Sequence, residues 1–409
     1  MKKIIHLLFI VILVAGCKNQ NEPVIVVTED AKPINLSAAS QKRVAQDNEF
    51  AFDLLKKTIE DSKETNVFVS PLSVSIALGM VWNGAVGNTK TEIETTLKMS
   101  GLSTSEINEY YKIMQTTLPS IDPTTKLNIA NSIWYRTGFP VKPTFLKVNT
   151  DYFNSEIQEL DFAQAWALDT INNWCARKTN DLIKKPLDKI SSDAAMYLIN
   201  AIYFKGIWRK KFDPKSTFIS QFTTESGSQV DVNMMHQTDT FAYAQDEKAQ
   251  YLDMPYGNKA YNMTVILPNY QTTTNDILSD MTVDKWNQTL QNLSNQEVEV
   301  YLPRFKSENK FELKPVLQKM GINLAFTGNA DFSNISDIGL AISRIIHSTF
   351  VEVNEEGTEA AAVTIVEMEY TSMPVRPVVR VNRPFLYIIR EKSTGVILFI
   401  GKMGGVIKY

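Results

Sequence analysis

The sequence predicts an α+β fold in a single domain, and three observations support that class. Helical periodicity dominates the first third of the chain, whereas runs typical of β-strands dominate the rest. No internal repeat is present in the sequence. The chain has 409 residues, 44% of them hydrophobic and 21% charged, and can bury a large core as one large domain or two average ones. The net charge of −3 comes without a basic stripe, so nucleic acids and heparin-like polyanions are not expected partners.

Residues 1–17 form a separate leader. A positive start, MKK, precedes the apolar run IIHLLFIVILV, which is too short for a membrane helix, and the small-residue sequence VAGC. Cys17 directly follows Ala15 and Gly16, which is similar to the bacterial lipoprotein box, in which this cysteine is acylated and becomes the first mature residue. The alternative is a plain secretory signal cut nearby. We therefore expect a lipid-anchored protein of the bacterial cell envelope, facing the periplasm or the cell surface.

The leader also bears on the cysteines and on the domain boundary. With Cys17 acylated, Cys175 is the only thiol left, so no intrachain disulfide is expected. Residues 18–43 are polar, contain Pro23 and Pro33 and lack helical periodicity, which predicts a flexible tether. The folded domain is expected to span residues 44–409.

The first elements of this domain are expected to be helices. Apolar side chains recur on one helical face near its start, at Val44, Phe52, Leu55 and Ile59. A second helix follows Ser70, whose hydroxyl is a suitable N-cap, with Pro71 in the first turn. Its sequence, LSVSIALGMVW, is apolar nearly all round, which predicts a buried helix that ends at Gly84 and Gly87.

Strands are expected to dominate after this point. Residues 196–208 are apolar on both faces, which predicts a central strand. Other expected strands are residues 127–135, 262–268, 298–305 and 345–353. Residues 311–320 are expected to form a helix closed by Gly321, and residues 385–403 a hairpin that turns at residues 392–395.

The segment EEGTEAAAVTIVEMEY, residues 355–370, has an ambiguous composition that periodicity resolves. As a helix it would scatter Glu359, Glu367 and Glu369 around the axis, so no amphipathic helix is encoded. At a period of two, all three carboxylates lie in one row, and the row that begins with Thr358 carries no charge. The segment is therefore predicted to be a strand with one face fit for burial, and an ordinary edge strand is the simplest interpretation.

No enzymatic chemistry is evident. Metal-binding, nucleophile-elbow and nucleotide-binding motifs are absent from the sequence. Beyond the leader only two histidines remain. His236 is expected to be a solvated residue of a polar loop, and His347, in an apolar strand, a satisfied core histidine rather than a catalytic base. We expect neither an enzyme nor a cofactor or metal ion.

Several segments together resemble the serpin family. They include NVFVSPLSVSIALGMVWNGAVGNTKTEI, LINAIYFKGIWRKKF, VYLPRFKSENKFELKPVLQKMGI and NRPFLYIIREKSTGVILFIGKM. The signature NEEGTEAAA, at residues 354–362, is highly specific for the family. The resemblance covers residues 44–409 and implies a single domain with a large mixed central sheet, surrounding helices and an exposed reactive loop.

The resemblance implies that a protease cleaves this loop as a substrate, and that the freed part inserts into the main sheet as a new strand. The implied hinge of the loop is Glu356, Gly357, Thr358, Glu359, Ala360, Ala361 and Ala362. The family's usual spacing places the reactive bond at Thr371–Ser372, with Tyr370 or Met368 as the alternative specificity residue, because the loop is about two residues longer than in antitrypsin-like members. A small hinge without bulky residues favours inhibition. The alternative is a non-inhibitory serpin-fold binding or storage protein.

The resemblance also assigns expected partners and gating residues. The expected targets are serine proteases of the elastase, chymotrypsin or subtilisin kind, with cysteine proteases as a second class, and the inhibitor is expected to be a monomer. Trp208 falls in the family's breach, where the loop first enters the sheet. The implied shutter beneath the sheet consists of Ser70, Ser73, Asn200 and His347. Because a lone polar side chain in an apolar strand needs a partner, we predict that His347 and Asn200 form a hydrogen bond with each other.

Overall fold

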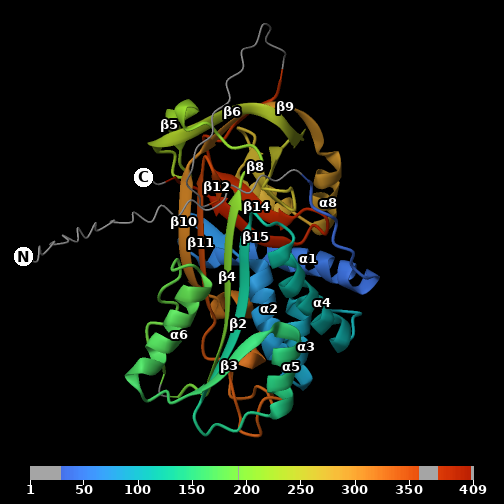
Figure 1. Cartoon of the computed structure of the whole chain (residues 1–409), viewed down its shortest axis with the longest axis vertical. Helices are drawn as coiled ribbons and strands as arrows, with labels where there is room; N and C mark the ends of the chain where they lie inside the picture. Colours follow the sequence, from blue (N-terminus) through green and yellow to red (C-terminus); the bar gives the residue numbers. More distant parts are fainter. Residues whose placement is uncertain (1–28, 192, 359–375, 407–409) are drawn as a thin grey trace, which may run out of the picture.

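The computed structural model describes residues 29–191, 193–358 and 376–406, and it confirms an α+β fold (Figure 1). One sheet contains nine strands. In spatial order these are β1 (Asn66–Val69), β15 (Ile397–Met403), β14 (Phe385–Glu391), β8 (Tyr261–Pro268), β7 (Ala249–Pro255), β6 (Gln229–Gln245), β9 (Ser294–Pro303) and β13 (Val378–Arg380), with β5 (Phe218–Thr223) paired to β6. The predicted hairpin at residues 385–403 is confirmed as β14 and β15.

The second sheet is the mixed sheet expected from the resemblance. Its order is β10 (Phe305–Glu312), β11 (Ile346–Asn354), β12 (Gly357–Thr358), β4 (Met196–Ile207), β2 (Lys126–Arg136) and β3 (Ser155–Leu160). The β2–β3 pair is parallel and the other pairs are antiparallel. The central position predicted for the strand at 196–208 is confirmed by β4.

The described part of the chain contains nine α-helices of at least six residues. They are α1 (Ala38–Asp61), α2 (Pro71–Trp82), α3 (Gly87–Thr96), α4 (Thr104–Thr117), α5 (Pro143–Phe153), α6 (Ala165–Lys178), α7 (Thr274–Asp280), α8 (Val283–Asn292) and α9 (Lys314–Lys319). Side chains alternate along β2, so Ile133 joins the main core with α1 and α2, whereas Trp134 joins a smaller core with α6. Helices α2 and α6 therefore cover opposite faces of the six-stranded sheet.

Helix α2 forms as its sequence predicts. The Ser70 hydroxyl accepts a hydrogen bond from the Ser73 N–H at 3.3 Å, and Pro71 occupies the first turn. Eleven of its twelve residues are buried, in agreement with a sequence that is apolar all round. This buried helix packs against β4 and supports one face of the six-stranded sheet (Figure 1).

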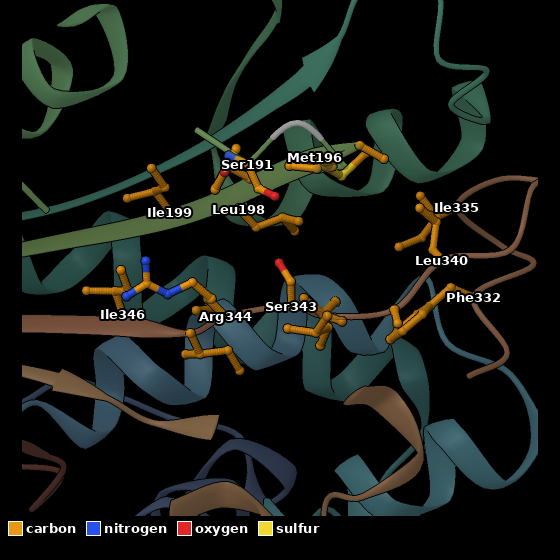
Figure 2. Close-up of a pocket in the computed structure, with 18 of the residues that line it drawn as sticks. Ser191, Met196, Leu198, Ile199, Phe332, Ile335, Leu340, Ser343, Arg344 and Ile346 are labelled. Atoms are coloured by element: carbon orange, nitrogen blue, oxygen red, sulfur yellow. Dashed lines mark hydrogen bonds between the residues drawn. The ribbon is translucent and has the colours of Figure 1, made fainter. Parts of the chain in front are cut away.

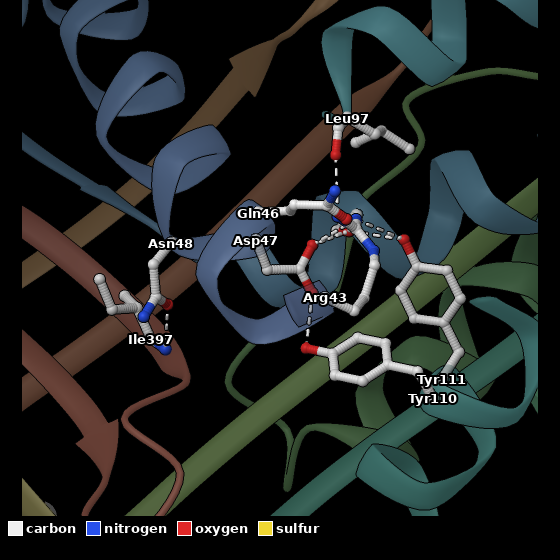
Figure 3. Close-up of polar contacts among 9 residues, drawn as sticks. Arg43, Gln46, Asp47, Asn48, Leu97, Tyr110, Tyr111 and Ile397 are labelled. Carbon is white, nitrogen blue, oxygen red and sulfur yellow. Dashed lines mark hydrogen bonds and ion pairs between the residues drawn. The ribbon is translucent and has the colours of Figure 1, made fainter. Parts of the chain in front are cut away.

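The predicted tether boundary at residue 43 is wrong. Helix α1 begins at Ala38, and Arg43 is fully buried. Its guanidinium forms a 2.6 Å ion pair with Asp47, and the Tyr110 hydroxyl donates to the same carboxylate at 2.6 Å (Figure 3). A polar sequence therefore belongs to the core here, because a long-range network of hydrogen bonds satisfies its charges.

The residues before α1 also contact the folded domain. The Ala31 N–H donates to the Asn258 carbonyl at 2.7 Å, and the Ile34 N–H donates to the Ser393 hydroxyl at 2.9 Å. Ala31 and Ile34, which the prediction assigned to a flexible tether, are therefore hydrogen-bonded to the folded domain. Within the described residues, no helix combines the length and the apolar character needed to cross a membrane.

Two further elements differ from expectation. The helix predicted at 311–320 is limited to α9, because Phe311 and Glu312 continue β10 and pair with His347 and Ile346. His236 lies in β6 rather than in a polar loop. In both cases a neighbouring strand that is distant in the sequence fixes the local conformation.

Candidate functional site

The site is built around the short strand β12, which lies between β11 and β4. Val353 of β11 is opposite Thr358 and Asn354 is opposite Gly357, so the chain turns back directly after β11. On its other edge, Thr358 is opposite Gly206 of β4. Two residues of the predicted hinge therefore occupy the space between β4 and β11. Below Thr358, among the described residues, these two strands have no ladder pairs with each other.

Thr358 has the most deeply buried side chain among the described hinge residues. Its exposure is 2%, and its hydroxyl lies 2.7 Å from the hydroxyl of Tyr256, the residue that follows β7. The Tyr256 ring is stacked on Trp208 with 4.4 Å between ring centroids and an interplanar angle of 10°. The breach position expected for Trp208 is thus adjacent to the buried end of the hinge.

Gly357 is required by a close approach of two backbones. Its φ is +149°, and a Cβ atom on this residue would lie 2.1 Å from the Gly206 carbonyl oxygen and 2.8 Å from the Ile207 Cα. Any side chain there would push β12 away from β4. The resemblance placed Gly357 in the hinge, and the structure adds a steric reason for a glycine at this position.

Two ion pairs and two hydrogen bonds donated by Trp208 hold the turn between β11 and β12. The Trp208 Nε1–H donates to the Asn354 carbonyl at 2.9 Å, and its backbone N–H donates to the Glu356 carbonyl at 2.8 Å. Glu356 forms a 2.6 Å ion pair with Lys211, and Glu355 a 2.6 Å ion pair with Arg304. These contacts fix the point at which the hinge enters the sheet.

The Glu355 carboxylate is buried but remains charged. Burial would raise its pKa, but hydrogen bonds from Arg304 and from the Thr217 hydroxyl outweigh burial and hold the pKa of Glu355 below its ordinary value. Removing Arg304 would leave this carboxylate buried without its counter-ion.

Below the hinge, a cavity of about 460 Å³ separates β4 from β11 (Figure 2). One wall is the beginning of β4, with Met196 and Leu198. The other is formed by Ser343, in the segment before β11, and by Ile346, the first residue of β11. Side chains of α2 also line it. The lining is largely apolar, so the cavity is suited to an apolar strand face.

Three of the four predicted shutter residues, Ser73, Asn200 and His347, line this cavity, and Ser70 contacts His347, but the pairing differs from the prediction. His347 Nε2 accepts a hydrogen bond from the Ser70 backbone N–H at 2.9 Å. Asn200 accepts from the Ser73 hydroxyl and donates to the Asn131 side chain at 2.6 Å. The predicted hydrogen bond between His347 and Asn200 is wrong, because these residues belong to β11 and β4, on opposite sides of the cavity.

His347 is a satisfied core histidine, as expected. It is 6% exposed, and burial lowers its pKa from 6.5 to about 4. His347 Nε2 accepts a hydrogen bond from the Ser70 N–H at the N-terminus of α2. Protonation of Nε2 would therefore place one N–H donor against another. Cys175, the other nucleophilic side chain of interest, is free and buried, and burial raises its pKa to about 12. Within the described ranges, no three His, Cys, Asp or Glu side chains are grouped to hold a metal ion.

Several predicted site residues lie outside the described residues. They are Cys17, the hinge residues Glu359, Ala360, Ala361 and Ala362, and the candidate reactive-bond residues Met368, Tyr370, Thr371 and Ser372. Sequence reasoning missed Tyr256, which carries no local signal. It also missed Arg304, although Arg304 lies in the motif VYLPRFKSENK, and a cation there could have been matched to Glu355.

Comparisons with known proteins agree with this geometry. Residues 45–404 match the family model described as "Serpin (serine protease inhibitor)". Human neuroserpin is 34% identical over 367 residues, which cover 86% of this chain and 88% of neuroserpin. An uncharacterized serpin-like protein of Methanosarcina acetivorans is 34% identical over 417 residues, covering 98% of this chain and 97% of that protein.

Solved structures show the same similarity. The native state of tengpin, a thermophilic serpin, superposes with a TM-score of 0.84 at 34% identity, covering 92% of this chain and 97% of tengpin. Human thyroxine-binding globulin in complex with thyroxine has a TM-score of 0.81 at 29% identity, covering 90% of this chain and 100% of that chain. The matched family model spans both sheets and the hinge between β11 and β4, and on this evidence the chain belongs to the serpin family.

Proposed function

We propose that this serpin inhibits proteases as a suicide substrate. The nucleophile of the protease attacks the Thr371 carbonyl carbon, the peptide bond to Ser372 breaks, and Ser372 leaves with a free amino group. The acyl-enzyme is then trapped, because the freed loop inserts between β4 and β11 before water can release the protease. The observation that carries this proposal is the hinge itself: Gly357 and Thr358 lie between the two strands, with a cavity below them.

The strand register supports insertion of the following residues. Each step beyond Thr358 along the loop is one step back from Gly206 along β4 and one step back from Val353 along β11. Six steps bring Thr364 opposite both Asn200 and His347. Because Thr358 points into the core, the same alternation turns Ala360, Ala362, Thr364, Val366 and Met368 inward, which is the row without charges.

The free energy available to trap the protease follows from this register. Ten loop residues, 359–368, would face residues 205–196 of β4. About ten new ladder hydrogen bonds at about 0.5–1.5 kcal/mol each would contribute roughly 5–15 kcal/mol. That range is comparable with the stability of a whole domain, and it is large enough to displace and distort a bound protease.

The expected targets follow from the loop sequence. Thr371 suits the small apolar specificity pocket of elastase-like enzymes, and Tyr370 suits a chymotrypsin- or subtilisin-like pocket. No Lys or Arg lies between Asn354 and Val375, so trypsin-like proteases should be poor targets. The test is incubation with elastase, chymotrypsin, subtilisin and trypsin, followed by denaturing gels and mass spectrometry. A released fragment that begins at Ser372 is expected, whereas fastest complex formation with trypsin, after a cut at Arg376, would contradict the assignment.

We also propose that Cys17 carries lipid and anchors a monomeric inhibitor to a bacterial envelope. The MKK start, the short apolar run and the VAGC sequence support acylation. Metabolic labelling with palmitate should label the wild-type chain but not Cys17→Ser. Equal labelling of the two chains would contradict acylation at this residue. The rival function, a non-inhibitory binding or storage protein, predicts a cleaved loop without trapped protease.

A further inference from the structure

A compact row of aromatic and charged side chains lies on one exposed face of the nine-stranded sheet. Tyr301 of β9 is at its centre. The Arg380 guanidinium carbon lies 3.6 Å from the Tyr301 ring centroid, and the His236 ring is stacked on the same tyrosine with 4.5 Å between centroids. The Phe218 ring meets Tyr301 edge-on at 6.2 Å. We call Phe218, His236, Tyr301 and Arg380 the Tyr301 ridge.

Strand pairing places the ridge on one face and hydrogen bonds fix it there. Arg380 is opposite Tyr301 across β13 and β9, and Tyr301 is opposite His236 across β9 and β6. The Tyr301 hydroxyl donates to Glu299 at 2.5 Å, and His236 Nε2 lies 3.3 Å from the same carboxylate oxygen. The side chains are therefore ordered before any partner arrives, which reduces the entropy lost on binding.

The ridge is accessible and offers both apolar surface and positive charge. Phe218 is 43% exposed, and Val378, beside the ridge on β13, is 42% exposed. In the part of the chain that the structure describes, no carboxylate lies within ion-pair distance of Arg380. Arg380 is thus held in place by a ring, with its charge available to a partner. Tyrosine and arginine are the residue types that most often dominate protein–protein interfaces.

The ridge lies within reach of a protease bound at the proposed reactive bond. Val378 follows Ser372 by six positions in the chain, a separation of at most about 20 Å. A protease of about 230 residues has a radius of gyration of about 17 Å, so its body must cover neighbouring surfaces when its active site holds Thr371. Strands β5, β6 and β9 lie together at one end of the molecule, and β13 pairs with β9 there (Figure 1).

We propose that the Tyr301 ridge is a second contact site for the target protease. It would accept a surface loop next to the active-site cleft of the protease, with a carboxylate against Arg380 and an apolar side chain against Phe218 and Val378. This proposal rests on the proposed inhibitory function, since the bond at Thr371 sets where the protease body lies. It adds a determinant of target choice that the reactive loop alone does not contain.

The test measures binding separately from trapping. Chymotrypsin, elastase and subtilisin whose catalytic serine is replaced by alanine are titrated with wild-type inhibitor, Arg380→Glu, Phe218→Ser and a control, Arg177→Glu. Arg177 is an exposed arginine of α6, far from β9 in Figure 1. For the protease that binds wild type most tightly, Arg380→Glu should raise the Kd at least about tenfold. This difference from wild type should become smaller as the salt concentration rises. The control should stay within about twofold of wild type.

Two outcomes would overturn the second site. One is that Arg380→Glu and Phe218→Ser, each shown to be folded by its melting curve, bind all three inactive proteases as wild type does. The other is that Arg177→Glu weakens binding as much as Arg380→Glu, since the effect would then be one of overall charge. Failure of the inhibitory function has a different signature: active proteases cleave the loop without forming complexes that resist denaturation, while the ridge variants still change the Kd.

Discussion

Replacing Thr358 by arginine should convert the inhibitor into a substrate. Thr358 is 2% exposed and its hydroxyl is hydrogen-bonded to Tyr256, so a longer side chain has no room in the present packing. The nearest carboxylates of the turn, Glu355 and Glu356, are already paired with Arg304 and Lys211. A guanidinium buried here would therefore lack a partner of its own, at a cost of several kcal/mol.

In the intact variant the arginine is expected to draw β12 out of the sheet, so burial of the arginine becomes part of the insertion step that competes with release of the protease. If about 3–4 kcal/mol of the cost of burial appears in the barrier to insertion, insertion slows about 10²- to 10³-fold. Hydrolysis of the acyl-enzyme then wins, and the protease leaves in active form.

The assay is a denaturing gel of Thr358→Arg with elastase, alongside a measurement of moles of inhibitor used per mole of protease inactivated. Thr358→Ser, which keeps the hydroxyl, is the matched control and should behave as wild type. Undiminished complex with Thr358→Arg would refute the reasoning, since insertion would then not require burial of this position.

Three further changes test the gate and the hinge. His347→Ala should leave the buried Ser70 N–H without an acceptor, at a cost of about 1–3 kcal/mol. The variant should therefore become latent or polymeric on mild warming. If it stays monomeric and active in the same warming series, His347 does not hold the sheet closed. Because burial lowers the pKa of His347 from 6.5 to about 4, its stabilising contribution is complete above pH 6.5 and is lost as pH falls toward 4, by up to about 3 kcal/mol. The unfolding midpoint in urea should fall over this range in wild type and less in His347→Gln, and equal slopes would assign the effect to other groups. Gly357→Ala should push β12 off β4 and lower the melting temperature of the uncut protein. The control is Gly328→Ala, where the added Cβ meets no atom within 4 Å. Equal melting temperatures for the two variants would show that β12 does not depend on the close approach of the backbones.

Local patterns predicted the parts of the fold whose causes are local. Helix α2 follows from a serine cap, a proline and an apolar run within twelve residues, and the hairpin of β14 and β15 follows from two strands with a turn between them. The end of β10 was assigned to a helix because the pairing of Phe311 with His347 joins positions 36 residues apart and leaves no local trace.

The same reason limited what could be predicted for the site. The predicted hydrogen bond between His347 and Asn200 is absent from the described structure, where each residue has other partners. The spacing of β4 and β11 depends on β12, which lies between them, and not on the sequence of either strand. The burial of Thr358 was predictable, because alternation alone sets the buried row once the strand is recognised. The partner of that hydroxyl, Tyr256, required the fold.

The most direct test of insertion compares the melting temperature of the intact protein with that of protein nicked in the loop. Insertion is expected to add roughly 5–15 kcal/mol of ladder hydrogen bonds. A domain of about 360 residues has an unfolding entropy of about 0.8 kcal/mol/K, so the nicked form should melt roughly 6–20 °C higher than the intact form. Equal melting temperatures, with the cut confirmed by mass spectrometry, would contradict insertion and leave a serpin fold that does not inhibit by this mechanism.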